Sequence, residues 1–287
     1  MNKIIILLGQ RVRSGTNFVG STLSMHPDVV TVPPDKSLGE FNLFRDRAIV
    51  DDVFNSIKKT GFGMDIKDDD LELYLKMYGE SWLKFMIDRF EIPPDKTIFI
   101  KSYVINNLDL WRMSFPDTKI AVIYRDGRDN VMSSVRASYD KRQWHGFTRD
   151  IKKRFNYYSG RSFINHTLHW VKTAKVIAHL LDKNEVQAFR YEDLTNSHSG
   201  IEDLLKYYNL AINHSIIERC LQAPVVGSSF GIGSGRTIKP NWKPDHDKSK
   251  FTFTEKWRNW GPIKKLVFKR LAGETLVALN YESNFDW

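Results

Sequence analysis

An unbroken apolar run near the start of the chain, Ile4 to Leu8, limits the fold more than any other stretch. It contains only isoleucine and leucine, and it ends at Gly9. Because every position is apolar, a strand here would be covered on both faces, which is typical of a strand inside a parallel sheet. The run is far too short to cross a membrane, and the basic loop that follows it differs from a signal peptide.

Strand and helix patterns alternate along the rest of the chain. Further strands are expected at residues 97–100, 119–124 and 185–190. Helices are expected at residues 17–25, 71–90, 130–139, 166–181, 201–208 and 262–279. This alternation predicts an α/β fold, a parallel sheet flanked by helices. Ligands of such sheets bind beyond the carboxyl ends of the strands. The first candidates for chemistry are therefore the residues there: Arg13, Lys101, Arg125 and Tyr191.

The length and composition indicate one globular unit. With 287 residues, 41% of them apolar, the chain can bury a sizeable core, and it contains no internal repeat. We therefore expect a single domain over residues 1–287. Residues 227–250 are rich in Gly, Ser, Lys and Pro and predict a mobile basic loop. Such a loop is either a solvated surface excursion or a lid over an anionic ligand.

The charge and the cysteine content narrow the class of partner. A formal net charge of +9 favours anionic ligands, although solubility alone would also explain it. Cys220 is the only cysteine, so an internal disulfide is excluded, and no clustered histidines suggest a zinc site. The sequence shows no export signal or membrane anchor, and a cytoplasmic location without membrane insertion is expected.

The loop after the first strand, "GQRVRSGTNF", suggests an anion site of an unusual kind. A P-loop that cleaves ATP or GTP needs a glycine followed by lysine and then serine or threonine, whereas Gly15 is followed by Thr16 and Asn17. The backbone N–H groups from Ser14 to Phe18 would still bind an anion at the start of the next helix. Arg13 would place a fixed positive charge beside it.

A second anion site is expected after the strand at 119–124. Arg125 ends this strand, and Ser133 follows in the next helix. An arginine fork and a serine hydroxyl together can hold a phosphate. Two phosphate sites at neighbouring strand ends fit a nucleotide phosphorylated at both ends of its ribose.

With this pairing the chain resembles the sulfotransferases, in particular the bacterial and carbohydrate-type members. Residues 13–16 resemble their 5′-phosphosulfate loop, and Arg125 with Ser133 resembles their 3′-phosphate site, in the same chain order. Cytosolic members usually carry lysine where Arg13 stands. Further similarity lies in "YEDL" at residues 191–194, in residues 228–230, and in the closing "KWRNW…LNYE". The resemblance thus spans residues 4–282.

The resemblance implies a donor, 3′-phosphoadenylyl sulfate (PAPS), a product, 3′-phosphoadenosine 5′-phosphate (PAP), and no metal. Arg13 would stabilise the negative charge on the leaving phosphate. Tyr103 stands where many relatives carry a catalytic histidine, so Glu40 is the expected general base, with a solvated surface glutamate as the alternative. The remaining donor-binding residues are expected to be Arg11, Ser14, Gly15, Thr16, Asn17, Phe18, Arg125, Ser133, Tyr191, Ser228, Phe230, Arg236 and Arg258.

Other functions remain open at this point. A nucleotide-dependent kinase would need the lysine that is missing after Gly15, and a nucleic-acid-binding protein would need basic and aromatic residues along one face. The acceptor is expected to be a small molecule such as a natural product, sugar or lipid precursor. Residues 40–61 and 139–163 would shape its pocket, and the basic, aromatic second segment would bind an anionic sugar or polymer or form an exposed amphipathic helix. The sequence leaves the oligomeric state open.

Overall fold

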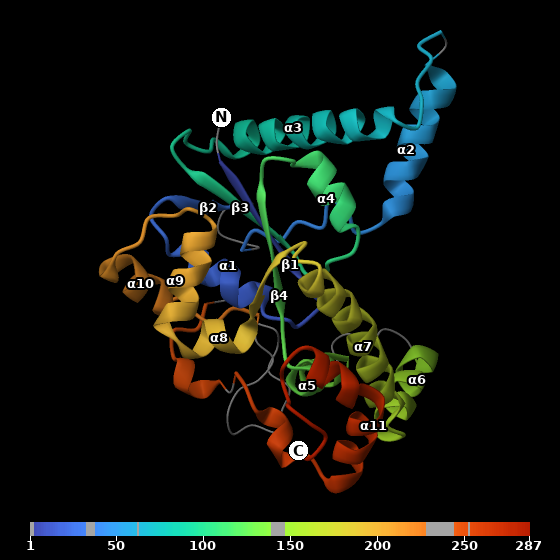
Figure 1. Ribbon diagram of the computed structural model, residues 1–287, viewed down its shortest axis with the longest axis vertical. Helices are drawn as coiled ribbons and strands as arrows, with labels where there is room; N and C mark the ends of the chain where they lie inside the picture. Colours follow the sequence, from blue (N-terminus) through green and yellow to red (C-terminus); the bar gives the residue numbers. More distant parts are fainter. Residues whose placement is uncertain (1–2, 33–37, 62, 139–146, 228–243, 252) are drawn as a thin grey trace.

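A five-stranded parallel sheet forms the centre of the molecule (Figure 1). The structure is a computed structural model that describes residues 3–32, 38–61, 63–138, 147–227, 244–251 and 253–287. The strands lie in the order β2-β3-β1-β4-β5. Their bounds are β1 (Ile4–Gly9), β2 (Val29–Thr31), β3 (Thr97–Ser102), β4 (Lys119–Tyr124) and β5 (Gln187–Arg190). This arrangement confirms the α/β fold predicted from the sequence.

The central strand β1 is buried on both faces, as its unbroken apolar run predicts. Ile4, Ile6 and Leu8 belong to one hydrophobic cluster, while Ile5 and Leu7 belong to another. Side chains alternate between the faces of a strand, so the two clusters lie on opposite sides of the sheet. β1 pairs with β3 on one side and with β4 on the other.

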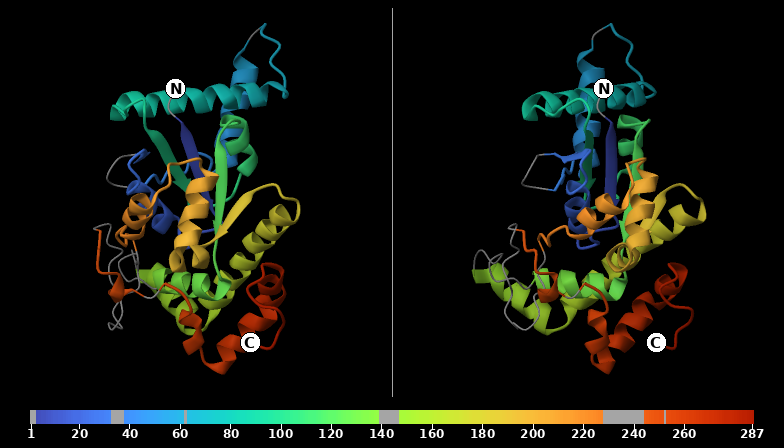
Figure 2. Two further views of the ribbon diagram at one scale, coloured as in Figure 1. Left: turned by 60° about the vertical axis from the view of Figure 1, so that its left-hand side comes forward. Right: turned by 90° about the vertical axis from the view of Figure 1, so that its left-hand side faces the viewer.

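Helices cover both faces of the sheet. Trp111, Trp170 and Phe268 bring helices α4, α7 and α11 into the first cluster, whereas Val19 and Leu204 bring α1 and α9 into the second. Figures 1 and 2 show α3 along one end of the molecule and α11 at the other. The helices are α1 (Thr16–Ser24), α2 (Arg47–Thr60), α3 (Asp70–Phe90), α4 (Leu108–Ser114), α5 (Gly127–Ser138), α6 (Phe147–Tyr158), α7 (Arg161–Asp182), α8 (Tyr191–Asn196), α9 (His198–Tyr207), α10 (His214–Leu221) and α11 (Pro262–Ala278).

Several elements differ from the expectation. Helix α5 begins at Gly127 rather than at residue 130, and α7 begins at Arg161 because Gly160 adopts a left-handed conformation just before it. The strand β2 was missed because three residues are too short to show a pattern. Helices α2, α4, α8 and α10 were also missed, since most of them are short or polar. Helix α6 lies within residues 139–163, where an exposed amphipathic helix was one of two alternatives.

Most of the basic loop expected at residues 227–250 lies outside the described residues, which omit 228–243. The end of this segment is ordered: Asp245 pairs with Val225 in an antiparallel bridge, and Lys248–Lys250 form a 3-10 helix, η2. The expectation of a single domain over residues 1–287 stays a prediction. Among the described helices, none has the length and apolar character needed to span a bilayer.

Candidate functional site

A cavity of about 370 Å³ lies where β1, β3 and β4 end. It is lined by residues from the loop after each of these strands, including Arg13, Tyr103 and Arg125. Ten of the residues that the sequence suggested for donor binding or catalysis belong to this cavity: nine line it, and Ser14 supports its wall. Tyr103 also lines it. The nine suggested residues that line it are Arg13, Gly15, Thr16, Asn17, Phe18, Glu40, Arg125, Ser133 and Tyr191. The carboxyl edge of the sheet therefore gathers residues from distant parts of the chain, as the topology predicts.

The loop after β1 presents the start of helix α1 to this cavity. Arg13 and Gly15 both have positive φ angles, 70° and 106°, which turn the chain sharply before α1 begins at Thr16. No side chain caps α1, so its first N–H groups are available to an anion. A Cβ on Gly15 would lie 2.2 Å from the Tyr191 ring, so no larger residue fits there. Ser14 supports the loop from beneath: its hydroxyl accepts a hydrogen bond from Asn130 (3.3 Å).

Arg13, Arg125 and Ser133 form one cationic wall of the cavity. Arg13 Nε donates to Ser133 Oγ at 2.9 Å, and Arg125 Nη1 donates to the Arg13 carbonyl oxygen at 3.2 Å. The Arg125 guanidinium lies 4.3 Å from the centre of the Tyr191 ring. The two expected anion sites are thus joined by direct contacts between their residues.

Burial and mutual repulsion shape the charges of this wall. Burial, with Arg125 nearby, lowers the pKa of Arg13 to about 10, so Arg13 remains charged at neutral pH. The Nε atom of Arg125 is buried and has no hydrogen-bond partner among the described residues. A buried donor without a partner costs free energy, which a bound anion would recover.

Glu40 also lines the cavity, and Lys101 holds it in place. Glu40 pairs with Lys101 in a parallel bridge, and Lys101 Nζ donates to Glu40 Oε2 at 3.0 Å. The same ammonium donates to Asn17 Oδ1 at 2.9 Å, although the Lys101 side chain is fully buried. Burial lowers the pKa of Lys101, while Glu40 opposes this shift. Lys101, whose role the sequence left undecided between ligand contact and packing, thus orients the Glu40 carboxylate and ties it to α1.

Lys256 is a cavity residue that the sequence did not indicate. It begins the 3-10 helix η3 (Lys256–Asn259) and lines the cavity beside Arg125. Its backbone N–H donates to Asp129 Oδ1 at 2.8 Å, which fixes the turn. Burial, followed by repulsion from Arg125, lowers the pKa of Lys256 to about 7. The signal was present in the "KWRNW" segment, but the sequence could not show which of its basic residues faces inward.

Some expected donor-binding residues are placed elsewhere. Arg11 points to helix α7, where it donates to the His166 carbonyl oxygen at 2.9 Å, and it does not line the cavity. Arg258 is exposed and pairs with Glu255 at 2.5 Å, also away from the cavity. Ser228, Phe230 and Arg236 lie outside the described residues, so the adenine side of the expected site is not described.

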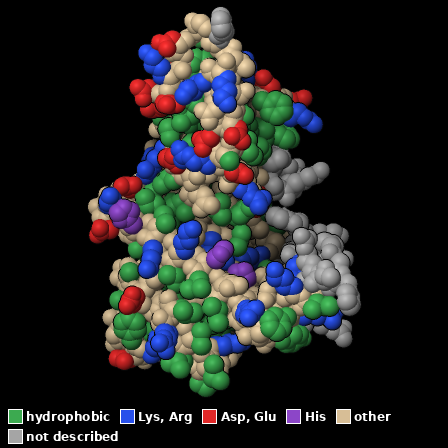
Figure 3. Space-filling view, turned by 90° about the vertical axis from the view of Figure 1, so that its right-hand side faces the viewer, with side chains coloured by type: hydrophobic (Ala, Val, Ile, Leu, Met, Phe, Trp, Pro, Cys, Tyr) green, Lys and Arg blue, Asp and Glu red, His purple; other side chains and the backbone are tan. Residues whose placement is uncertain are grey.

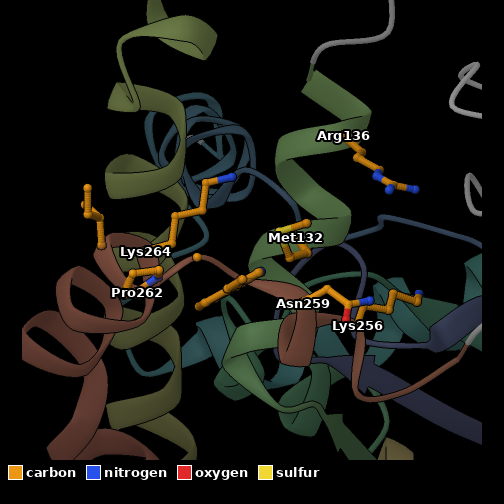
Figure 4. A pocket seen from close by; sticks show the side chains of 9 residues that line it. Met132, Arg136, Lys256, Asn259, Pro262 and Lys264 are labelled. Carbon is orange, nitrogen blue, oxygen red and sulfur yellow. The ribbon is translucent and has the colours of Figure 1, made fainter.

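A second cavity, of about 410 Å³, adjoins the first and shares Lys256 with it. Figure 4 shows that its side chains come from α5, η3 and the first turn of α11. Neither Glu40 nor the loop after β1 lines it. The residues suited to chemistry are in the first cavity, which is therefore the candidate site.

A buried carboxylate cluster supports the site from behind. Glu192 Oε1 accepts a hydrogen bond from the Asp126 N–H, and Glu192 Oε2 accepts one from the Tyr281 hydroxyl, both at 3.1 Å. Burial and the neighbouring Asp126 raise the pKa of Glu192 to about 7. Arg128 binds the other side of Asp126, with Nη2 at 2.6 Å from Oδ2. This cluster fixes the turn that carries Arg125.

The chain is similar to known sulfotransferases. The sequence profile described as the sulfotransferase family matches residues 5–213. Among curated protein sequences, none matches. The sulfotransferase domain from the curacin biosynthetic pathway is 16% identical, with a TM-score of 0.51, over 98% of this chain and 99% of that one. A mouse sulfotransferase complexed with PAP is 14% identical (TM-score 0.49, 98% and 88% covered). A sulfotransferase from Alicyclobacillus acidocaldarius is 10% identical (0.47, 98% and 96%).

Proposed function

The chain belongs to the sulfotransferase family, and we propose that it transfers a sulfuryl group from PAPS to a hydroxyl or amine of a small-molecule acceptor. The observation that carries this proposal is the cavity at the strand ends, where Arg13, Arg125 and Ser133 meet the start of α1. A donor with a phosphosulfate at one end of its ribose and a phosphate at the other needs two anion-binding groups in one cavity. The absence of a second cysteine beside Cys220 supports a reducing, cytosolic setting.

The residues present fit such a donor. The uncapped first turn of α1 offers backbone N–H groups to a phosphosulfate, and Arg13 adds a charge beside them. Arg125 and Ser133 would hold the 3′-phosphate. Arg125 Nε, a buried donor with no partner among the described residues, would donate a hydrogen bond to one of its oxygens. Lys256, which lines the same cavity, is a further candidate for this phosphate. When bound, PAPS supplies the sulfuryl group, and PAP is released.

Charge stabilisation and positioning would carry most of the catalysis. As the bond between the sulfur and the phosphate oxygen breaks, that oxygen gains negative charge, and Arg13 stabilises it. The acceptor oxygen or nitrogen forms the new bond to sulfur and loses its proton. We assign Glu40 as the base that takes this proton, because Lys101 orients its carboxylate within the cavity.

A kinase remains the nearest alternative, and the loop argues against it. The loop after β1 lacks the lysine and the hydroxyl that hold a triphosphate and its magnesium ion in a P-loop NTPase. Since no residue of this loop calls for magnesium, transfer in the presence of a chelator should match transfer with added magnesium. A strict requirement for the ion would favour a kinase instead.

Binding of PAP tests the proposal directly. Calorimetry should show that PAP binds much more tightly than AMP, because only PAP reaches both anion sites. Arg125→Ala should weaken PAP by at least about 2 kcal/mol, or roughly thirtyfold, through the loss of a charged hydrogen-bond donor. Arg112→Ala removes an exposed arginine of α4 that does not line the cavity, and it should leave binding unchanged.

Two results would overturn the proposal. Equal affinity for PAP and AMP would show that the cavity does not contain two anion sites. Normal PAP binding by Arg125→Ala would show that Arg125 does not bind the 3′-phosphate. A screen of hydroxyl and amine acceptors with sulfur-labelled PAPS would then identify the acceptor class.

A further inference from the structure

Helix α6 turns an apolar stripe toward solvent. Ile151, Phe155 and Tyr158 are 51%, 55% and 73% exposed, and their spacing of four and three residues puts them on one side of the helix. The half-buried residues of this stretch are polar or amphipathic, Lys153, Asn156 and Tyr157, on the opposite side. A surface helix of a globular protein has the reverse pattern, with its apolar side inward. This helix is therefore built to contact something other than water.

The next helix also exposes apolar side chains. Ile164, Leu168 and Val176 of α7 are exposed, and α6 packs against α7. The Arg161 guanidinium lies 5.2 Å from the centre of the Phe155 ring, which joins the two helices near the turn between them. We call the exposed residues of these helices the α6–α7 face: Ile151, Lys152, Arg154, Phe155, Tyr158, Arg161, Ile164, Leu168, Lys172, Lys175 and Val176.

The charge of the α6–α7 face has one sign. The acidic residues of α6 and α7 are Asp150 and Asp182, one on each side of the segment 151–181. Within that segment, the exposed Lys152, Arg154, Arg161, Lys172 and Lys175 flank the apolar side chains. Figure 3 looks at the side of the molecule on which Figure 1 places α6 and α7. Its lower half carries hydrophobic and basic side chains together, with few acidic ones.

Another apolar surface in the chain lacks this charge pattern. Helix α3 exposes Leu73, Met77 and Phe85, and Phe85 is 62% exposed, similar to Phe155. Its apolar side chains alternate with acidic ones, since the helix also carries Asp70, Glu72, Glu80 and Asp88. Exposed apolar area alone thus does not distinguish the α6–α7 face. Its combination with purely basic flanks does.

This combination selects among the possible partners. A soluble polyanion would use the basic side chains but leave Ile151, Phe155 and Tyr158 without a role. A second copy of the chain would bring the same basic residues against each other in a symmetric contact, which is repulsive. An anionic bilayer surface accommodates both, because lipid phosphates meet the basic side chains while apolar side chains enter the boundary with the acyl chains.

We propose that the α6–α7 face docks this protein on the surface of a bilayer that contains anionic lipids. Helices α6 and α7 then lie along the interface, with Phe155 and Ile151 in the acyl boundary and Lys152 and Arg161 among the headgroups. The docking is independent of the donor cavity, which none of these residues lines.

Sedimentation of the purified protein with lipid vesicles tests this proposal. We expect binding to vesicles of equimolar phosphatidylcholine and phosphatidylglycerol, little binding to pure phosphatidylcholine, and a decline with added salt. Ile151→Ser with Phe155→Ser should weaken binding by more than about tenfold, since both apolar side chains would leave the interface. Lys152→Ser should weaken it by about fivefold, the loss of one basic side chain near an anionic surface.

The matched control is Phe85→Ser, which removes a similarly exposed phenylalanine from α3 and should leave vesicle binding unchanged. Circular dichroism would verify that each variant is folded. Vesicle binding that the Ile151/Phe155 variant retains would overturn the proposal. Failure of the natural protein to bind anionic vesicles would also overturn it. The alternative occupants would then be a soluble polyanion that the protein binds, or a second copy in a dimer that the same two substitutions dissociate.

Discussion

The raised pKa of Glu192 makes a prediction about stability against pH. In the unfolded chain a glutamate ionises near pH 4.5, whereas in the folded protein burial and Asp126 raise its pKa to about 7. The folded state therefore holds this proton more tightly than the unfolded state does. The stability that Glu192 contributes is fully present below about pH 4.5, and it is lost as the pH rises to about 7.

The size of the effect follows from the shift. Each pKa unit corresponds to about 1.4 kcal/mol, so complete loss of the proton lowers the free energy of unfolding by up to about 3 kcal/mol. The substitution Glu192→Gln removes the titration but keeps the shape. Its amide oxygen can still accept from the Asp126 N–H, and its amide group can donate to the Tyr281 hydroxyl oxygen.

Urea unfolding of both proteins at several pH values from 5 to 8 is the assay. We expect Glu192→Gln to be more stable than the natural protein at pH 8, with the difference shrinking toward pH 5. Subtracting the two curves cancels the titration of all other groups. A difference that stays constant across this range would show that Glu192 is not the buried, proton-retaining group described here, and the reasoning would fail.

Further predictions concern the cavity itself. Glu40→Gln should lower turnover by about 10²- to 10⁴-fold while leaving PAP binding nearly unchanged, and near-full turnover on a hydroxyl acceptor would exclude Glu40 as the base. Because the pKa of Lys256 is about 7 in the free protein, Lys256 should take up a proton when PAP binds at pH 8. Calorimetry in buffers of different ionisation enthalpy measures this uptake, which Lys256→Met should abolish. Gly15→Ala should abolish PAP binding, because its Cβ would collide with the Tyr191 ring. An unchanged affinity in that variant would show that the loop can shift.

The sequence predicted the central features of the fold because they depend on local pattern. The unbroken apolar run at residues 4–8 indicated a strand covered on both faces, and β1 is fully buried. The strands β3 and β4 were found for the same reason. The short β2 was missed, since three residues show no period. Helix α6 was expected only as one of two alternatives for its segment, and its apolar side is turned outward.

The site could be predicted only in outline. Arg13 and Arg125 were predicted as site residues because each follows a strand, and the sheet topology brings the strand ends together. Nothing local shows that Lys101 would bind Glu40, as the two residues are far apart in the chain. The sequence also could not separate Arg13 from Arg11, which the turn of the loop directs to opposite sides, one to the cavity and the other to α7.

The strand order of the sheet has a consequence for how the chain folds as it is made. The central strand β1 is synthesised first, yet Ile4 pairs with Ile98 and Ile5 pairs with Lys119. Until β3 and β4 leave the ribosome, the apolar strand segment of β1 has no strand to pair with, and it is prone to aggregate. Long-range parallel pairing of this kind also slows folding, because the chain loses the entropy of loop closure before the stabilising contacts between the strands form. We therefore expect the yield of folded protein to rise when synthesis is slowed by cooling or when a chaperone that shields apolar segments is supplied.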